Sequence, residues 1–202
     1  MHIGGTDFDQ RLNLALAMPL LGLGHTGPHG REVPSHVFHD LATWHLIHWQ
    51  YGGPAVRAAQ ALRGDYRDPA LHRLLMAVLE RQFGHRIAAE VERAKIAASS
   101  ADAQAWLDLD FIEPALGAPL PPGPLAGHLQ ALLARVAACA QDCVRRAGVA
   151  AGALDAVYLT GGSSALRPFQ ATLRTALPGV PLVEGDLFGG VAAGLAVTAA
   201  LV

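Results

Sequence analysis

The residues best suited to chemistry are two glycines and two serines that follow a short apolar run late in the chain. In VYLTGGSSALRP, residues 157–168, the apolar run predicts a buried strand, and the spacing after the serines predicts a helix. Gly161 and Gly162 lack a Cβ, so a ligand or another backbone could approach closely there. We expect Ser163 or Ser164 to cap the helix, whose first N–H groups could then receive an anion such as phosphate. A glycine pair between strand and helix is also common as a simple tight turn, and for this stretch alone that alternative stays open.

A second polar group lies in the middle of the chain, in VERAKIAASS, residues 91–100. Glu92, Lys95 and Ser99 are three and four residues apart, which places them on one stripe of a predicted helix. We expect this stripe to lie away from the apolar face of the helix, where it could hold the hydroxyls and base of a nucleotide. The apolar face carries Ile87, Val91, Ala94 and Ala98. The simpler interpretation is that Glu92 and Lys95 form a solvated ion pair, which contributes about 0.5 kcal/mol or less.

Histidines are concentrated in HVFHDLATWHLIHW, residues 36–49. Among His36, His39, His45 and His48 are pairs three apart, which on a helix could offer two imidazoles to a metal ion. Such pairs also recur by chance in a chain with ten histidines, so core and surface histidines beside tryptophans are the favoured interpretation. We therefore assign no metal ligand and no catalytic residue.

Composition and charge exclude several classes of protein. The chain has 202 residues, of which 51% are hydrophobic, enough for one large domain or two small lobes. Its net charge of -2 lacks the basic excess of a nucleic-acid or anionic-membrane binder, so we expect neither partner. Cys139 and Cys143 lie four apart in a predicted helix and indicate reduced thiols in a cytoplasmic protein. The most apolar stretch, residues 187–202, is shorter than the roughly 20 residues of a membrane span and predicts a core helix.

Hydrophobic periodicity predicts the elements that position these groups. Helices are expected at residues 6–19, 34–51, 124–147 and 166–177, with two consecutive helices between residue 69 and about residue 100, and strands at 103–112, 115–120, 156–159 and 181–183. Thr6 and Asp9 have the spacing of a capping box at the start of the first helix, and residues 22–34 predict a loop. The alternation after residue 124 favours an α/β layer. We therefore predict a discontinuous α/β lobe, residues 1–15 with 121–202, and an inserted helical subdomain with short strands, residues 16–120.

Several stretches together resemble the ATPase domain of the seventy-kilodalton heat-shock chaperones, the DnaK-like family. Their sequences are most similar to those of the YegD-like chaperones. They are HIGGTDFDQRL (2–12), AEVERAKIAASS (89–100), AVYLTGGSSALRPFQ (156–170) and FGGVAAGLAV (188–197). The resemblance runs nearly end to end but covers only the second half of that domain. It implies a lobe of the actin-like, ribonuclease H-like fold with an inserted subdomain.

The resemblance also implies roles for particular residues. Glu92, Lys95 and Ser99 match positions that contact adenosine from the inserted subdomain. The loop that contacts the phosphates and adenosine matches Gly161, Gly162 and Ser163. The glycine pair before the first helix of the lobe matches Gly4 and Gly5. The implied cofactor is ATP or ADP with Mg in a full-length parent, with none tightly bound to this chain alone.

Some positions depart from the family pattern. Ile96 stands where an arginine usually stacks on adenine, and Ala165 stands where a second arginine lines the same pocket. Phe188 occupies a position that is usually acidic, although Asp186 is close by. These departures leave open a degenerate, non-catalytic interaction module with the same fold.

The partners implied are an adenine nucleotide and the missing N-terminal half of the ATPase domain, with client proteins or co-chaperones as further candidates. The glycine-rich phosphate hairpins of the family, with their metal-holding aspartates, would precede this chain. We therefore expect the parent to be an ATPase and this chain alone to hydrolyse no ATP. A lobe separated from its other half exposes an apolar face, through which two copies could dimerise.

Overall fold

The chain separates into two compact units in the computed structural model, which describes residues 3–100, 105–185, 189 and 195–199. The helical unit is Thr6–Leu129, and the α/β unit consists of Met1–Gly5 with Gln130–Val202. The boundaries predicted from sequence, 15/16 and 120/121, differ from this division, because they assign the first helix and residues 121–129 to the α/β lobe. The chain is a mixture of helices and small sheets, which confirms the α/β class at this level.

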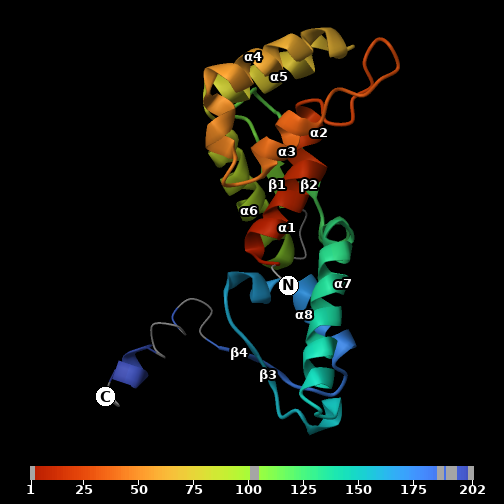
Figure 1. Ribbon diagram of the computed structural model, residues 1–202, viewed down its shortest axis with the longest axis vertical. Helices are drawn as coiled ribbons and strands as arrows, with labels where there is room; N and C mark the ends of the chain where they lie inside the picture. Colours follow the sequence, from red (N-terminus) through yellow and green to blue (C-terminus); the bar gives the residue numbers. More distant parts are fainter. Residues whose placement is uncertain (1–2, 101–104, 186–188, 190–194, 200–202) are drawn as a thin grey trace. The chain divides into compact units, whose positions relative to one another are not determined.

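The helical unit packs helical elements against one small antiparallel sheet. Its helical elements are α1 (Gly5–Leu12), the π-helical turn η1 (Asn13–Ala17), α2 (Met18–Leu20), α3 (His36–Ala42), η2 (Ile47–Tyr51), α4 (Gly53–Ala61), η3 (Leu62–Asp65), α5 (Pro69–Glu80) and α6 (Gly84–Ser100). Strands β1 (Ala105–Asp108) and β2 (Gly117–Leu120) pair antiparallel. Helices α4 and α5 lie side by side, and α6 packs along β1 (Figure 1).

The core of the helical unit follows the predicted periodicity. Helix α6 buries the four apolar residues assigned to its inner face, and β1 alternates buried Ala105 and Leu107 with exposed Trp106 and Asp108. Among the described residues, the largest fully buried side chains all belong to this unit. They are Phe8, Leu12, Met18, Leu21, Phe38, Leu41, Ile47, Leu75, Leu79, Ile87, Leu107 and Leu109. The helical unit therefore has a substantial core of its own.

Two predicted helices differ from the structure in their internal continuity. The first runs on to Leu20 but contains the π-helical turn η1. The helix predicted over residues 34–51 is wrong as a single element, because α3 ends at Ala42 and Thr43 adopts an extended conformation. Thr43 Oγ1 donates to the backbone oxygen of His39 at 2.7 Å and accepts from Gln10 Nε2 at 2.6 Å. The Thr43 side chain thus competes with the helical backbone pattern at this break.

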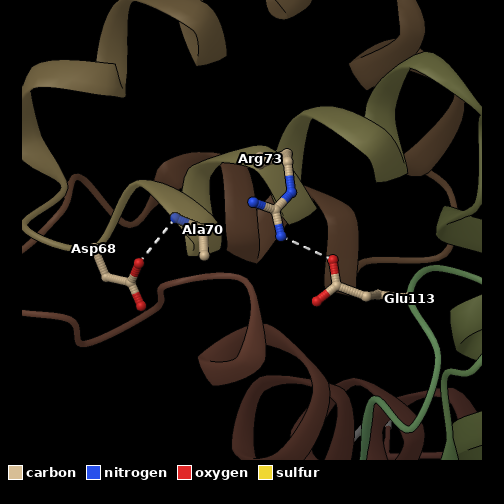
Figure 2. Close-up of polar contacts among 4 residues, drawn as sticks. All are labelled: Asp68, Ala70, Arg73 and Glu113. Carbon is tan, nitrogen blue, oxygen red and sulfur yellow. Dashed lines mark hydrogen bonds and ion pairs between the residues drawn. The ribbon is translucent and has the colours of Figure 1, made fainter.

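Exposed polar contacts fix the start and the flank of α5. Asp68 caps the helix, because its Oδ1 accepts from the backbone N–H of Ala70 at 2.8 Å. Arg73 pairs with Glu113 at 2.9 Å, and both side chains remain well exposed, at 65% and 44% (Figure 2). An exposed pair of this kind contributes little to stability, about 0–1 kcal/mol.

The α/β unit contains a parallel strand pair joined through a helix. Its elements are the long helix α7 (Pro122–Arg146), which begins in the helical unit, then η4 (Ala151–Ala153), β3 (Val157–Leu159), η5 (Gly162–Ala165), α8 (Arg167–Ala176) and β4 (Leu182–Glu184). Val157 pairs with Leu182, and Leu159 pairs with Glu184. The predicted order of strand, helix and strand is confirmed.

The apolar end of the chain lies partly outside the described residues. Residues 195–199 are helical, as predicted, but Leu195 and Val197 are 66% and 62% exposed, so the expected core helix is wrong for these residues. None of the helices in the described part of the chain combines the length and apolar character that crossing a bilayer requires.

A steric test of the helical unit is available in the loop at residues 22–34. A methyl group at Gly27 would overlap the backbone oxygen of Asp65, whereas one at Gly64 would meet no described atom within 4 Å. We expect Gly27→Ala to lower the free energy of unfolding by about 1–3 kcal/mol through overpacking. Gly64→Ala, the matched control, should be near neutral. Urea unfolding would measure both, and equal effects of the two variants would contradict the described loop packing.

Candidate functional site

The glycine turn lies directly after β3 in the α/β unit. Gly161 has a φ of 82°, a conformation that favours glycine, and no described atom lies within 4 Å of where its Cβ would be. The backbone N–H and the Oγ of Ser164 both donate to the Gly161 oxygen, at 3.0 Å and 2.7 Å. The turn therefore combines a positive φ and open space at Gly161 with hydrogen bonds that close it locally.

The serine cap predicted for the following helix is wrong. Helix α8 has Leu166 at its N-cap, with no side-chain capping bond, and Ser163 and Ser164 lie one turn earlier in η5. The helix starts here because Pro168 suits the first turn, where its missing N–H costs nothing. The N–H groups of Ser164 and Leu166 donate within the turn, which leaves those of Gly162 and Ser163 as the candidate donors to an anion.

The two glycine-rich segments expected at the site come together within the α/β unit. A methyl group at Gly5 would lie 2.7 Å from Ser163 Oγ, although more than 150 residues separate them in sequence. The absence of a Cβ at Gly5 therefore leaves room for the serine hydroxyl, and Gly4 precedes it directly. The structure therefore places Gly5 and Ser163 next to each other.

Gln170 supports this turn and was missed by the sequence analysis. Its Nε2 donates to the Ser164 backbone oxygen at 3.2 Å and to Glu184 Oε1 at 2.7 Å, and the residue is buried. Gln170 thus connects the turn, α8 and the end of β4. The sequence carried a weak signal, because Gln170 interrupts the otherwise apolar inner face of α8.

In the helical unit, Lys95 is directed inward and pairs with Asp9 of α1. The Lys95 Nζ lies 2.7 Å from Asp9 Oδ1, and the two side chains are 5% and 21% exposed. The alternative interpretation, a solvated Glu92–Lys95 pair, is therefore wrong, since the partner of Lys95 is Asp9. Asp9, which was expected to close a capping box with Thr6, serves instead to pair a buried ammonium group. Pairing of this kind is the usual condition for burying a charge.

The polar stripe of α6 divides between the interior and the surface. Lys95 and Ser99 are buried beside Ala94 and Ala98, whereas Glu92 is exposed. The expectation that the three residues share a face away from the apolar side is wrong for Lys95 and Ser99. Ile96, at the position where the family has an arginine, is 52% exposed.

Burial raises the pKa of Asp9 above its ordinary value of 3.8. The hydrogen bond and charge of Lys95 lower this pKa, and the charge of Glu92 adds to the rise. Asp9 therefore holds a proton more readily in the folded chain than in the unfolded chain. Its contribution to stability is fully present below about pH 3.8 and is lost as the pH rises through the raised pKa.

The raised pKa of Asp9 predicts how stability changes with pH. The free energy of unfolding of the wild type, minus that of Asp9→Asn, should fall as the pH rises from below 3.8 through the raised pKa of Asp9 and then level off. Asparagine removes the titrating group while keeping its shape, so the difference isolates Asp9. Urea unfolding at each pH would measure it. A difference that is flat, or that rises with pH, would show that Asp9 titrates normally or with a lowered pKa.

Asn13 is a further buried polar residue that the sequence analysis missed. It lies four residues after Asp9 in η1 and is 1% exposed, and its Oδ1 has no hydrogen-bond partner among the described residues. Turns of π-helix occur frequently at functional sites. The sequence signal was the spacing of Asp9 and Asn13, which places these two polar side chains on one face of the helix.

The remaining expected positions contribute no further site geometry. His36, His39, His45 and His48 are exposed, and in the part of the chain that the structure describes no three or more His, Cys, Asp or Glu side chains could hold a metal ion together. Phe188 and Asp186 lie outside the described residues. A scan of the chain against models of known protein families finds no match.

Proposed function

We propose that this chain forms the adenosine- and phosphate-contacting half of an ATP-binding cleft with the actin-like fold of the seventy-kilodalton heat-shock chaperones. The observation that carries the proposal is the proximity of Gly5 and Ser163, because both belong to glycine-rich segments assigned to the nucleotide on resemblance alone. Two such segments, distant in sequence, meet in one compact unit beside the end of a strand. Ligands of α/β sheets commonly bind at that position.

The residues of the α/β unit fit a phosphate group. Gly161 offers open space and a backbone conformation that a side chain would disfavour, and Ser163 adds a hydroxyl donor next to the Cβ-free Gly5. Backbone N–H groups of Gly162 and Ser163 would add donors without any charged side chain. This arrangement would hold phosphate oxygens through hydrogen bonds and keep side chains out of their way.

The helical unit would supply the adenosine contacts, Glu92, Lys95 and Ser99. Glu92 is exposed and could accept from a ribose hydroxyl directly. Lys95 would have to exchange Asp9 for the nucleotide, or act through Asp9, because its ammonium group is already paired. Bound MgATP supplies the phosphoryl group. The chain's own contribution is binding and orientation, and we expect no ATP hydrolysis by this chain alone.

The second candidate is an interaction module that keeps the fold without the chemistry. The engaged Lys95 and the exposed Ile96 favour it, because both reduce the polar surface available to a base. The proximity of Gly5 to Ser163 favours nucleotide binding instead, since it joins two segments that the resemblance assigns to the nucleotide.

Calorimetric titration distinguishes the two functions. ADP, ATP and adenosine, each with Mg²⁺, would be titrated into the 202-residue chain. Nucleotide binding predicts heats that saturate, with ADP tighter than adenosine because the phosphates are recognised by the glycine turn. Absence of binding by all three ligands would favour the interaction module. Equal affinity for ADP and adenosine would contradict the phosphate-binding role of the turn.

A further inference from the structure

The two cysteines lie exposed on one face of α7, outside the proposed nucleotide site. Cys139 and Cys143 are free thiols four residues apart in the last two turns of this helix. Side chains at this spacing are neighbours, with Cβ atoms about 5–6 Å apart. On a different face of the helix, Gln141 Nε2 donates to the Ala176 oxygen of α8 at 3.0 Å, which anchors this part of α7.

The spacing of the two thiols limits what they can do together. A disulfide needs Cβ atoms about 3.5–4.5 Å apart, so a bridge within the helix would require its backbone to distort. A structural zinc site needs four ligands. No group of three or more candidate ligands exists in the described residues, and Asp142, the adjacent carboxylate, is held by Arg145 and Arg146. The two thiols therefore suit an ion that accepts only two ligands.

The charges around the thiols favour an anionic complex. When two thiols bind a monovalent ion they release two protons, and the resulting bis-thiolate complex carries one negative charge. Arg135 lies four residues before Cys139, and Arg146 lies three residues after Cys143, so both exposed residues flank the thiols on the same stripe. Arg145 and Arg146 share one carboxylate, that of Asp142, so positive charge is in excess around the thiols. Thiolates are soft ligands that select ions such as Cu(I).

From this arrangement we infer that Cys139 and Cys143 form a two-coordinate site for one soft monovalent metal ion of the Cu(I) type. The helix sets the distance between the two sulfurs, the ion bridges them, and the arginines balance the charge of the complex. The site belongs to the α/β unit alone and does not depend on nucleotide binding.

Anaerobic titration of Cu(I) into the full chain, in competition with the chromophoric chelator bicinchoninate, tests this site. The wild type should bind one ion per chain. Cys139→Ser and Cys143→Ser should each weaken binding by more than the roughly 10- to 100-fold that loss of an outer-shell partner costs. Circular dichroism would check that each variant keeps its helix content.

A spacing variant provides the matched control. Ala138 is exposed, so Cys139→Ser with Ala138→Cys keeps two thiols and every charge on the helix. The thiols then lie five residues apart and point roughly 140° away from each other around the helix axis. This variant should bind Cu(I) as weakly as the single-cysteine variants. Binding as tight as that of the wild type would overturn the site, as would one ion per two wild-type chains or no tight binding at all.

Discussion

Replacing Lys95 with methionine should lower the free energy of unfolding at neutral pH by about 3 kcal/mol. The substitution leaves the carboxylate of Asp9 desolvated without the ammonium group that lies 2.7 Å from it. Removal of one partner from a buried pair is costly because the remaining charge has neither water nor counterion. Asp9 retains 21% exposure, which keeps the cost at the lower end of the usual range. Urea unfolding followed by tryptophan fluorescence reports on the helical unit, which contains Trp44, Trp49 and Trp106.

Two controls separate the charge effect from lost packing. Asp9→Leu/Lys95→Met replaces both partners with apolar side chains and should recover most of the lost stability. Arg73→Met breaks the exposed pair with Glu113 and should cost about 1 kcal/mol or less. The loss in Lys95→Met should also shrink below the raised pKa of Asp9, where the carboxyl group is neutral. Equal losses in Lys95→Met and Arg73→Met would contradict a buried Asp9–Lys95 pair.

The second large effect concerns the glycine turn. Gly161→Val should abolish measurable ADP binding, because a branched side chain would fill the space next to the candidate phosphate donors and would disfavour the backbone conformation. Gly179→Val is the matched control, since Gly179 also has a positive φ and no described atom within 4 Å. Both variants should lose a similar amount of stability, about 1–2 kcal/mol. Only Gly161→Val should lose the nucleotide. Loss of ADP binding in both variants, or in neither, would contradict the claim that the glycine turn binds ADP.

Local sequence patterns predicted the helices and strands well where hydrophobic periodicity agrees with the glycine and proline turn signals. Strand β3, helix α8 and strand β4 were predicted to within about two residues, because an apolar run, a glycine turn and a helical repeat follow each other in order. The capping residue of α8 was wrongly assigned, because serine was favoured as a cap whereas the helix starts next to Pro168, whose fixed φ suits the first helical turn. The competition between two possible helix starts is decided here by one residue, Pro168.

Contacts between distant residues could not be predicted from the pattern. A lysine beside a glutamate on a helix predicts a surface pair, and nothing in the neighbourhood of Lys95 reveals that Asp9, more than 80 residues earlier, lies against it. The proximity of Gly5 and Ser163 is equally non-local. The resemblance identified the segments that carry these residues, but only the fold brings the individual atoms together.

The most direct test of the nucleotide-binding proposal is the response of individual backbone amides to ADP and Mg²⁺, measured by heteronuclear NMR on the isotopically labelled chain. The amide resonances of Gly4, Gly5, Gly161, Gly162 and Ser163 should shift together and follow one saturation curve. If these resonances stay in place at high ADP concentration while others shift, or if none shifts at all, the glycine segments of the α/β unit do not bind the nucleotide.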